Sequence, residues 1–201
     1  MVETRLGYYK WHIIIAVIVI VCGFVIYNSV TSDKEPDLSF VFVSTKYMNT
    51  QYFKDAKSEI ELLLKDVNHD SARVADVKSF TEKNEEDVLN RLEECIASGE
   101  YNAYVADKQA FEKIKDKSVF EDASVYISSD EKNEYLEDSD GRLYAVSLRD
   151  NSLAKRLGMV ENDGLYIAVR VDMENGERTG KMKNAMNISK YIINNRDKYN
   201  M

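Results

Sequence analysis

Cysteine, histidine and proline are scarce in this chain, and the scarcity of the first two limits the disulfides and metal sites that it can form. Cys22 lies in an apolar run near the N-terminus, so Cys95 is the only cysteine beyond residue 30 and no intramolecular disulfide can form there. The 171 residues from 31 to 201 must therefore hold together through a hydrophobic core, which this length can supply. His69 is the only histidine in that part, and one histidine without neighbouring cysteines makes a poor transition-metal site. We predict no metal and no cofactor, and we expect Cys95 to be a buried structural thiol on a helix face.

The chain also lacks familiar catalytic motifs and a basic stripe. It contains no G-x-S-x-G, H-E-x-x-H, Walker loop or dinucleotide-binding fingerprint. We therefore predict no catalytic residue and no enzyme activity, with a hydrolase of unfamiliar site kept as an alternative. The first 30 residues hold Glu3, Arg5 and Lys10, a net charge of +1, so the rest of the chain carries −9 against a total of −8. Such an acidic surface repels phosphate backbones, so nucleic acid is not an expected partner.

Residues 11–30, WHIIIAVIVIVCGFVIYNSV, form an apolar run with no Asp, Glu, Lys or Arg. At 1.5 Å per residue this run can cross a hydrocarbon core of about 30 Å, which predicts a transmembrane helix and the membrane as a partner. Arg5 and Lys10 precede it and acidic residues follow it, so residues 1–10 are predicted to be cytoplasmic and the C-terminal domain extracellular. The alternatives are a cleaved signal peptide or a lipoprotein acylated at Cys22. Both fit less well, because no A-x-A-like site occurs and a bulky residue precedes the cysteine.

Beyond this run, residues 31–37 form a polar stalk that holds the only proline, and residues 38–201 form the predicted extracellular domain. Apolar residues recur at three- and four-residue steps between Phe53 and Val67 and again in residues 81–100, which predicts two amphipathic helices. Phe111 and Ile114 indicate a shorter third helix. The predicted strands around them are 38–44, 73–80, 101–106 and 165–171. This alternation predicts an α/β class fold, a three-layer α/β/α domain with a mostly parallel sheet of about five strands.

The second half of the domain has a looser pattern. Residues 125–127 are predicted to form a short strand, and Asp140-Gly141 is predicted to be a hairpin turn between 135–136 and 143–148. A short helix is expected over 151–158. The closing helix shows its apolar face in residues such as Met182 and Ile192. Thin cysteine usage with abundant Lys, Asn, Ile and Tyr favours a bacterial source.

Polar residues at strand ends supply the candidate binding site. In open α/β sheets a ligand crevice lies beyond the carboxyl ends of the strands, at a switch point in strand order. Hydroxyls, an ammonium group and a phenol at such a place suit a small polar ligand. The residues predicted to bind it follow the first and third strands and are Ser44, Thr45, Lys46, Tyr47, Asp107 and Lys108.

Two acidic clusters are weaker candidates. Residues 66–70, DVNHD, resemble the start of a calcium loop, but Ser71 and Val77 occupy the places where an EF-hand needs Gly and Glu. A polar turn between a helix and a strand explains this segment better. Asp138 and Asp140 are close in sequence, as paired catalytic carboxylates would be, yet the segment EDSDG is typical of a turn.

Three segments resemble the extracellular solute-binding proteins of the type 2 periplasmic-binding fold, in particular short membrane-anchored members from low-GC Gram-positive bacteria. These segments are LSFVFVSTKYMNTQYF, SGEYNAYVADKQAFEKI and DGRLYAVSLRDNSLAKRLGM, and the resemblance extends over residues 38–195. It implies that LYIAVRV and the closing helix return into the first lobe of such a protein. Only 16 residues separate Leu148 from Leu165, where a complete member has a whole second lobe. The resemblance therefore implies a derivative with one lobe, which cannot close around a solute as two lobes do.

These observations lead to two functional hypotheses. The first is a membrane-anchored extracellular domain that resembles one lobe of a solute-binding protein and binds a small molecule or partner protein without catalysis. The second is a structural or interaction subunit that docks onto a membrane complex such as a transporter.

Overall fold

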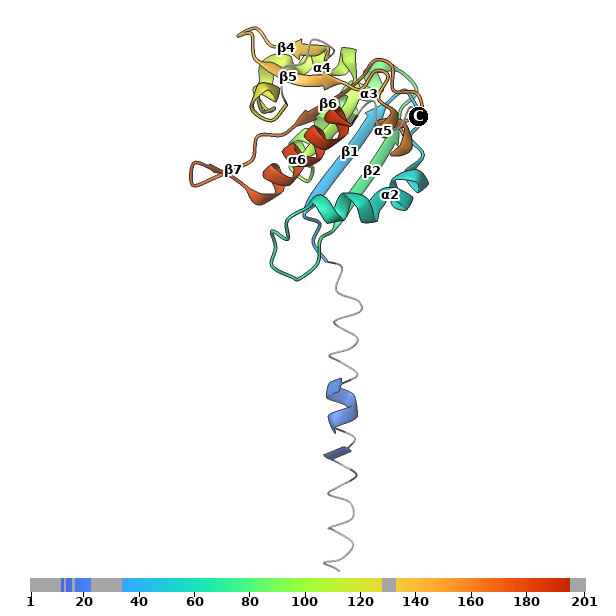
Figure 1. Ribbon diagram of the computed structural model, residues 1–201, viewed down its shortest axis with the longest axis vertical. Coiled ribbons are helices and arrows are strands. Elements are labelled where there is room, and N and C mark those ends of the chain that lie inside the picture. The colour runs from blue at the N-terminus through green and yellow to red at the C-terminus, as the bar shows by residue number, and fades with distance from the viewer. Residues whose placement is uncertain (1–11, 13, 16, 23–33, 128–132, 196–201) are drawn as a thin grey trace, which may run out of the picture. The chain divides into compact units, whose positions relative to one another are not determined.

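The computed structural model describes residues 12, 14–15, 17–22, 34–127 and 133–195 (Figure 1). The chain divides into two compact units, Met1–Glu35 and Pro36–Met201. Each unit is described by itself below.

The N-terminal unit requires a correction to the predicted transmembrane helix. Its described residues between 12 and 22 are helical, and the longest unbroken run among them covers residues 17–22. The rest of the predicted span, residues 11, 13, 16 and 23–30, lies outside the described residues, as does the predicted cytoplasmic tip, residues 1–10. In the described part, no helix combines the length and the apolar character that crossing a bilayer requires. The predicted transmembrane helix is therefore wrong on this finding, and so is the single-pass membrane location with an extracellular domain that depended on it.

The C-terminal unit is built on a six-stranded sheet in the order β2-β1-β3-β6-β5-β4. The strands β1, β2 and β3 run parallel, whereas β3–β6, β6–β5 and β5–β4 are antiparallel pairs. The strand bounds are β1 Leu38–Ser44, β2 Ala75–Thr81, β3 Ala103–Asp107, β4 Tyr135–Glu137, β5 Leu143–Ser147 and β6 Leu165–Val169. The fold is α/β, but the prediction of a mostly parallel sheet of about five strands is wrong, because the sheet is mixed and has six strands.

The direction of β6 is the physical reason for this correction. After β5, the chain passes through α5 (Ser152–Arg156) and returns as β6 from the edge of the sheet at which β5 ended. A connection that begins and ends at the same edge of the sheet yields an antiparallel neighbour. A parallel neighbour needs a crossover connection that carries the chain back to the opposite edge. The hairpin of β4 and β5 adds another antiparallel pair, in the place where the sequence predicts it.

Helices cover both faces of the sheet. One core cluster contains the inward side chains of α2 (Thr50–Leu63), α5 and α6 (Gly180–Asn194), and Figure 1 shows α6 running alongside β1. The other cluster contains those of α3 (Glu85–Ser98) and α4 (Lys108–Ile114). Cys95 lies in this second cluster, so the prediction of a buried thiol is confirmed, and burial raises its pKa. The central strand β1 is buried along its full length between the two cores.

Local capping explains where the helices begin and end. The side chains of Asn49, Asn84 and Asn151 accept hydrogen bonds from backbone N–H groups in the first turns of α2, α3 and α5. Gly99 ends α3 in the left-handed conformation that is typical of a glycine at a helix C-terminus. Acidic residues fill the first turn of α3, where they interact favourably with the helix dipole.

Other segments differ from the sequence-based expectations. Residues 123–125 form a 3-10 helix, η2, instead of part of a strand at 125–127, because Asp122 caps a tight turn there. A second 3-10 helix, η1, covers Lys115–Lys117. A two-stranded hairpin, β7 (Met173–Glu174) and β8 (Glu177–Arg178), projects from the body before α6 (Figure 1) and was not expected.

Candidate functional site

Strand register brings the ends of five strands to one edge of the sheet. Ser44 at the end of β1 lies opposite Thr81, and Asp107 at the end of β3 lies opposite Leu165 at the start of β6. Ser147 at the end of β5 pairs with Tyr166 in β6. Residues far apart in the sequence thus meet at this edge, which we call the strand-edge site. The polar residues that it contains are Ser44, Thr45, Lys46, Tyr47, Asp107, Lys108, Glu134, Ser147 and Arg149.

Asp107 joins the ends of β1 and β3. Its Oδ1 accepts a hydrogen bond from the hydroxyl of Ser44 at 2.8 Å, and its Oδ2 accepts one from the backbone N–H of Thr45 at 2.8 Å. The Thr45 hydroxyl also donates to Oδ2 at 3.3 Å. Ser44 Oγ in turn accepts from the backbone N–H of Lys46 at 3.0 Å. Both oxygens of Asp107 therefore serve to fix the loop that carries Lys46 and Tyr47.

A second polar group lies around Glu134. Its Oε1 accepts a hydrogen bond from the hydroxyl of Tyr166 and lies 3.4 Å from the Lys108 ammonium, which also lies over the Tyr166 ring at 6.0 Å. The hydrogen bond from Tyr166, followed by Lys108, lowers the pKa of Glu134. Burial and the neighbouring carboxylate raise the pKa of Tyr166. Lys108 is thus paired internally.

Lys46 differs from the other charged groups of the strand-edge site. Its ammonium makes no hydrogen bond or ion pair with any residue that the structure describes, and it lies 3.7 Å from the position that a Cβ at Gly164 would occupy. Arg149, by contrast, pairs with Asp163 at 3.3 Å. The next side chain, Tyr47, is 67% exposed. Lys46 and Tyr47 are therefore the groups of this site that are open to a ligand.

The neighbouring loop after α5 supports the β1–α2 loop. The backbone N–H of Asn49 donates to Gly158 O at 2.8 Å. Gly158 has a φ of +101°, and a Cβ there would lie 2.2 Å from the carbonyl oxygen of Asn49. Glycine is therefore required for this close approach, which fixes the loop at Asn49, a second point besides those held by Asp107.

The strand-edge site contains all six residues predicted from the sequence and several that sequence reasoning missed. The missed residues are Glu134, Ser147, Arg149, Gly164 and Tyr166. Ser147 and Tyr166 lie in β5 and β6, and the other three lie within two residues of a strand. Their place in the sequence could have identified them, because each lies at or beside the end of an apolar run that forms a strand. Knowledge that β6 runs antiparallel would have placed them beside Asp107.

The other acidic candidates lie elsewhere and are engaged in turns. Asp66 Oδ2, Asn68 Oδ1 and Asp70 Oδ1 each accept a backbone N–H from within their loop. Among the described residues, no group of three His, Cys, Asp or Glu is placed to hold a metal ion. His69 is exposed in this loop, which precedes β2 and so lies at the opposite edge of the sheet from Asp107.

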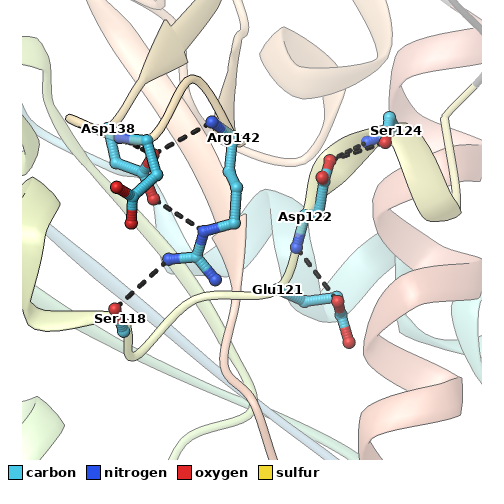
Figure 2. Close-up of polar contacts among 7 residues, drawn as sticks. Ser118, Glu121, Asp122, Ser124, Asp138 and Arg142 are labelled. Carbon is cyan, nitrogen blue, oxygen red and sulfur yellow. Dashed lines mark hydrogen bonds and ion pairs between the residues drawn. The ribbon is translucent and has the colours of Figure 1, made fainter.

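Asp138 and Asp140 belong to the turn of the β4–β5 hairpin, and Figure 2 shows Asp138 beside Arg142. Asp138 Oδ1 accepts the backbone N–H groups of Asp140 at 3.0 Å and Arg142 at 2.9 Å. Its Oδ2 accepts Nε of Arg142 at 2.7 Å, and the guanidinium reaches Ser118 Oγ at 3.4 Å. These contacts lower the pKa of Asp138. The carboxylate therefore organises the turn, in agreement with its interpretation as turn chemistry.

No protein-family model, curated protein or solved structure matches this chain. The resemblance to solute-binding proteins accordingly stays a prediction, and the function is argued from the residues of the site.

Proposed function

We propose that the C-terminal unit is a binding domain without catalytic activity, whose strand-edge site holds a small polar solute that carries an anionic group. The observation that supports this proposal is the open ammonium of Lys46. The other charged groups of the strand-edge site already have partners, and these groups are Asp107, Lys108, Glu134 and Arg149. A ligand anion would therefore meet Lys46 without displacing an existing ion pair.

The surroundings of Lys46 favour such a ligand. Asp107 and Gly158 fix the loop on two sides, so little ordering of the protein is needed when a solute binds. Tyr47, the next residue, adds an exposed aromatic ring, against which the carbon skeleton of a solute can pack. Asp107 and His69 lie at opposite edges of the sheet and cannot act together on one substrate, which supports binding over hydrolysis.

A thermal-shift screen of the full chain with small carboxylates, phosphate and neutral polyols tests the proposal. An anion that binds should stabilise the fold by about 2.7 kcal/mol at a concentration 100 times its Kd. Lys46→Ala should abolish this stabilisation. The matched control is Lys190→Ala, since Lys190 is an exposed lysine on α6 without a described side-chain partner. Equal stabilisation of both variants, or stabilisation by polyols alone, would contradict the proposal.

A second candidate function is the binding of a partner protein at the same edge. The β1–α2 loop exposes Tyr47, and the loop after α5 exposes Val160, whose exposed fraction is 52%. The hydrogen bond from Asn49 to Gly158 joins these two loops. Exposed apolar side chains of this kind are typical of the centre of an interface. Val160→Asp should then abolish a discrete cross-link formed by a photoreactive residue at position 47, and no small anion should stabilise the chain.

A further inference from the structure

A cavity separate from the strand-edge site lies between α2 and α5. Its volume is about 350 Å³, and Tyr52, Asp55, Ala56, Lys155 and Arg156 line it. Cavities that hold small ligands begin at about 300 Å³. None of the lining residues belongs to the strand-edge site, so the two sites can be tested independently.

The cavity exists because a small residue occupies the middle of a helix face. On α2, Asp55 and Ala56 lie three and four residues after Tyr52, and Glu59 lies four and three residues after those two, so the four side chains share one face. Ala56 is the short side chain among them and leaves a hollow above the seam where α2 meets α5 and α6. Ile60, Leu153 and Ile188 pack in this seam and leave no room for a water molecule. The floor of the cavity at Ala56 thus adjoins a tightly packed seam.

The charges that line the cavity are not equally open. Arg156 Nη2 forms an ion pair with Glu59 Oε2 at 2.6 Å, and Glu59 Oε1 also accepts a hydrogen bond from the hydroxyl of Tyr191. Lys155 is exposed, and its side chain makes no hydrogen bond or ion pair in the part of the chain that the structure describes. Among the described residues, the one side-chain partner of Asp55 is the neutral amide of Gln51, which donates to it at 2.9 Å, so the negative charge of Asp55 is not compensated by any of them. The cavity therefore offers one free cation and one free anion.

We propose that this cavity binds a small zwitterion with an apolar body. The ligand's anionic group meets Lys155, its cationic group meets Asp55, and its apolar body lies on Ala56 and against the ring of Tyr52, which is 47% exposed. A ligand with a single charge would leave one of the two protein charges facing it without a partner. A zwitterion satisfies both, and its apolar body covers the apolar floor.

The test uses the full chain labelled with ¹³C at alanine methyl groups and follows the Ala56 methyl signal by NMR. The probes are L-phenylalanine, 3-phenylpropionate and phenethylamine, which share a ring and differ in charge. Phenylalanine should shift the Ala56 signal and bind about two- to fivefold more tightly than either singly charged probe, as expected for exposed ion pairs. Equal binding of the three probes, or no shift at Ala56, would overturn the proposal.

Three variants assign the contacts. Lys155→Ala should weaken the binding of phenylalanine to the affinity of phenethylamine and leave the binding of phenethylamine unchanged. Asp55→Asn should weaken the binding of phenylalanine and leave the binding of 3-phenylpropionate no weaker. Ala56→Leu fills the hollow and should abolish binding of all probes. Lys183→Ala, on an exposed lysine of α6, is the matched control and should change nothing. The proposal is refuted if Lys155→Ala and Lys183→Ala bind phenylalanine equally well.

Discussion

At the scale of single residues, Asp107 fixes the loop between β1 and α2. Replacing it by Ala removes the acceptor for the hydroxyl of Ser44 and for the N–H of Thr45, so we expect a loss of about 1–3 kcal/mol in the free energy of unfolding. Asp107→Asn keeps one acceptor oxygen and should cost less. Urea unfolding of the two variants measures both losses. An alanine variant as stable as the parent chain would show that the loop is held without Asp107.

Asn184 provides a second prediction at this scale. It is fully buried on α6, where its amide donates to the carbonyl oxygens of Lys65 at 2.8 Å and Asp37 at 3.1 Å and its Oδ1 accepts the N–H of Lys65 at 2.9 Å. Asn184→Ala leaves these buried groups without partners and should lower the free energy of unfolding by about 2 kcal/mol or more.

The near-isosteric variant Asn184→Asp distinguishes polarity from packing. An ionised carboxylate facing two carbonyl oxygens should destabilise the fold more than alanine does at pH 7. Burial raises the pKa of such a carboxyl, so this penalty is present above the raised pKa and disappears as pH falls toward the unfolded value of about 4. In unfolding curves at several pH values, the free energy of unfolding of Asn184→Asp should rise relative to that of Asn184→Ala as pH falls. A constant difference would contradict the role assigned to the amide hydrogens.

At the scale of elements, the β4–β5 hairpin depends on Asp138, whose side chain is only 4% exposed. The backbone N–H of Arg142, followed by its guanidinium and the N–H of Asp140, lowers the pKa of this carboxyl. A depressed pKa in the folded state contributes stability above the unfolded pKa of about 3.9, and this contribution is lost as pH falls through the folded value. The stability difference between the parent chain and Asp138→Asn should therefore shrink below about pH 4. A stability difference that does not change with pH would contradict this role of the Asp138 carboxylate.

The elements also show how much of the fold the sequence determines locally. The periodic apolar faces of α2, α3 and α6 and the hairpin turn at Gly141 could be predicted, because each signal lies within one short segment. The direction of β6 could not, because LYIAV is buried on both faces in either direction and nothing in it records which neighbour it joins. That direction depends on the connection through α5, whose five residues stay at one edge of the sheet.

The same distinction applies to the strand-edge site. Ser44, Thr45 and Asp107 could be placed together because they end parallel strands that follow a regular alternation of strand and helix. Glu134 and Tyr166 could not, because they reach the edge through antiparallel strands. The hollow above Ala56 was equally inaccessible from sequence, since it depends on how α5 packs against α2.

At the scale of the whole molecule, the sheet separates two apolar cores that share no side chain. Ile188 and Ile60 belong to the core under α6 and α2, and Ile114 belongs to the core under α4. Each Ile→Val substitution removes one buried methylene and should cost about 1 kcal/mol. Because Ile188 and Ile114 lie on opposite faces and touch no common partner, their costs should add to within about 0.5 kcal/mol in the double variant.

The pair Ile60 and Ile188 is the control for this prediction. Both side chains line the seam between α2, α5 and α6, so the space left by one substitution is available to the other. Their double variant should therefore deviate from additivity by more than the pair on opposite faces does. Urea unfolding of the two double variants and the three single variants measures both couplings. A large coupling between Ile188 and Ile114 would mean that the central strands, buried on both sides, transmit changes in packing across the sheet.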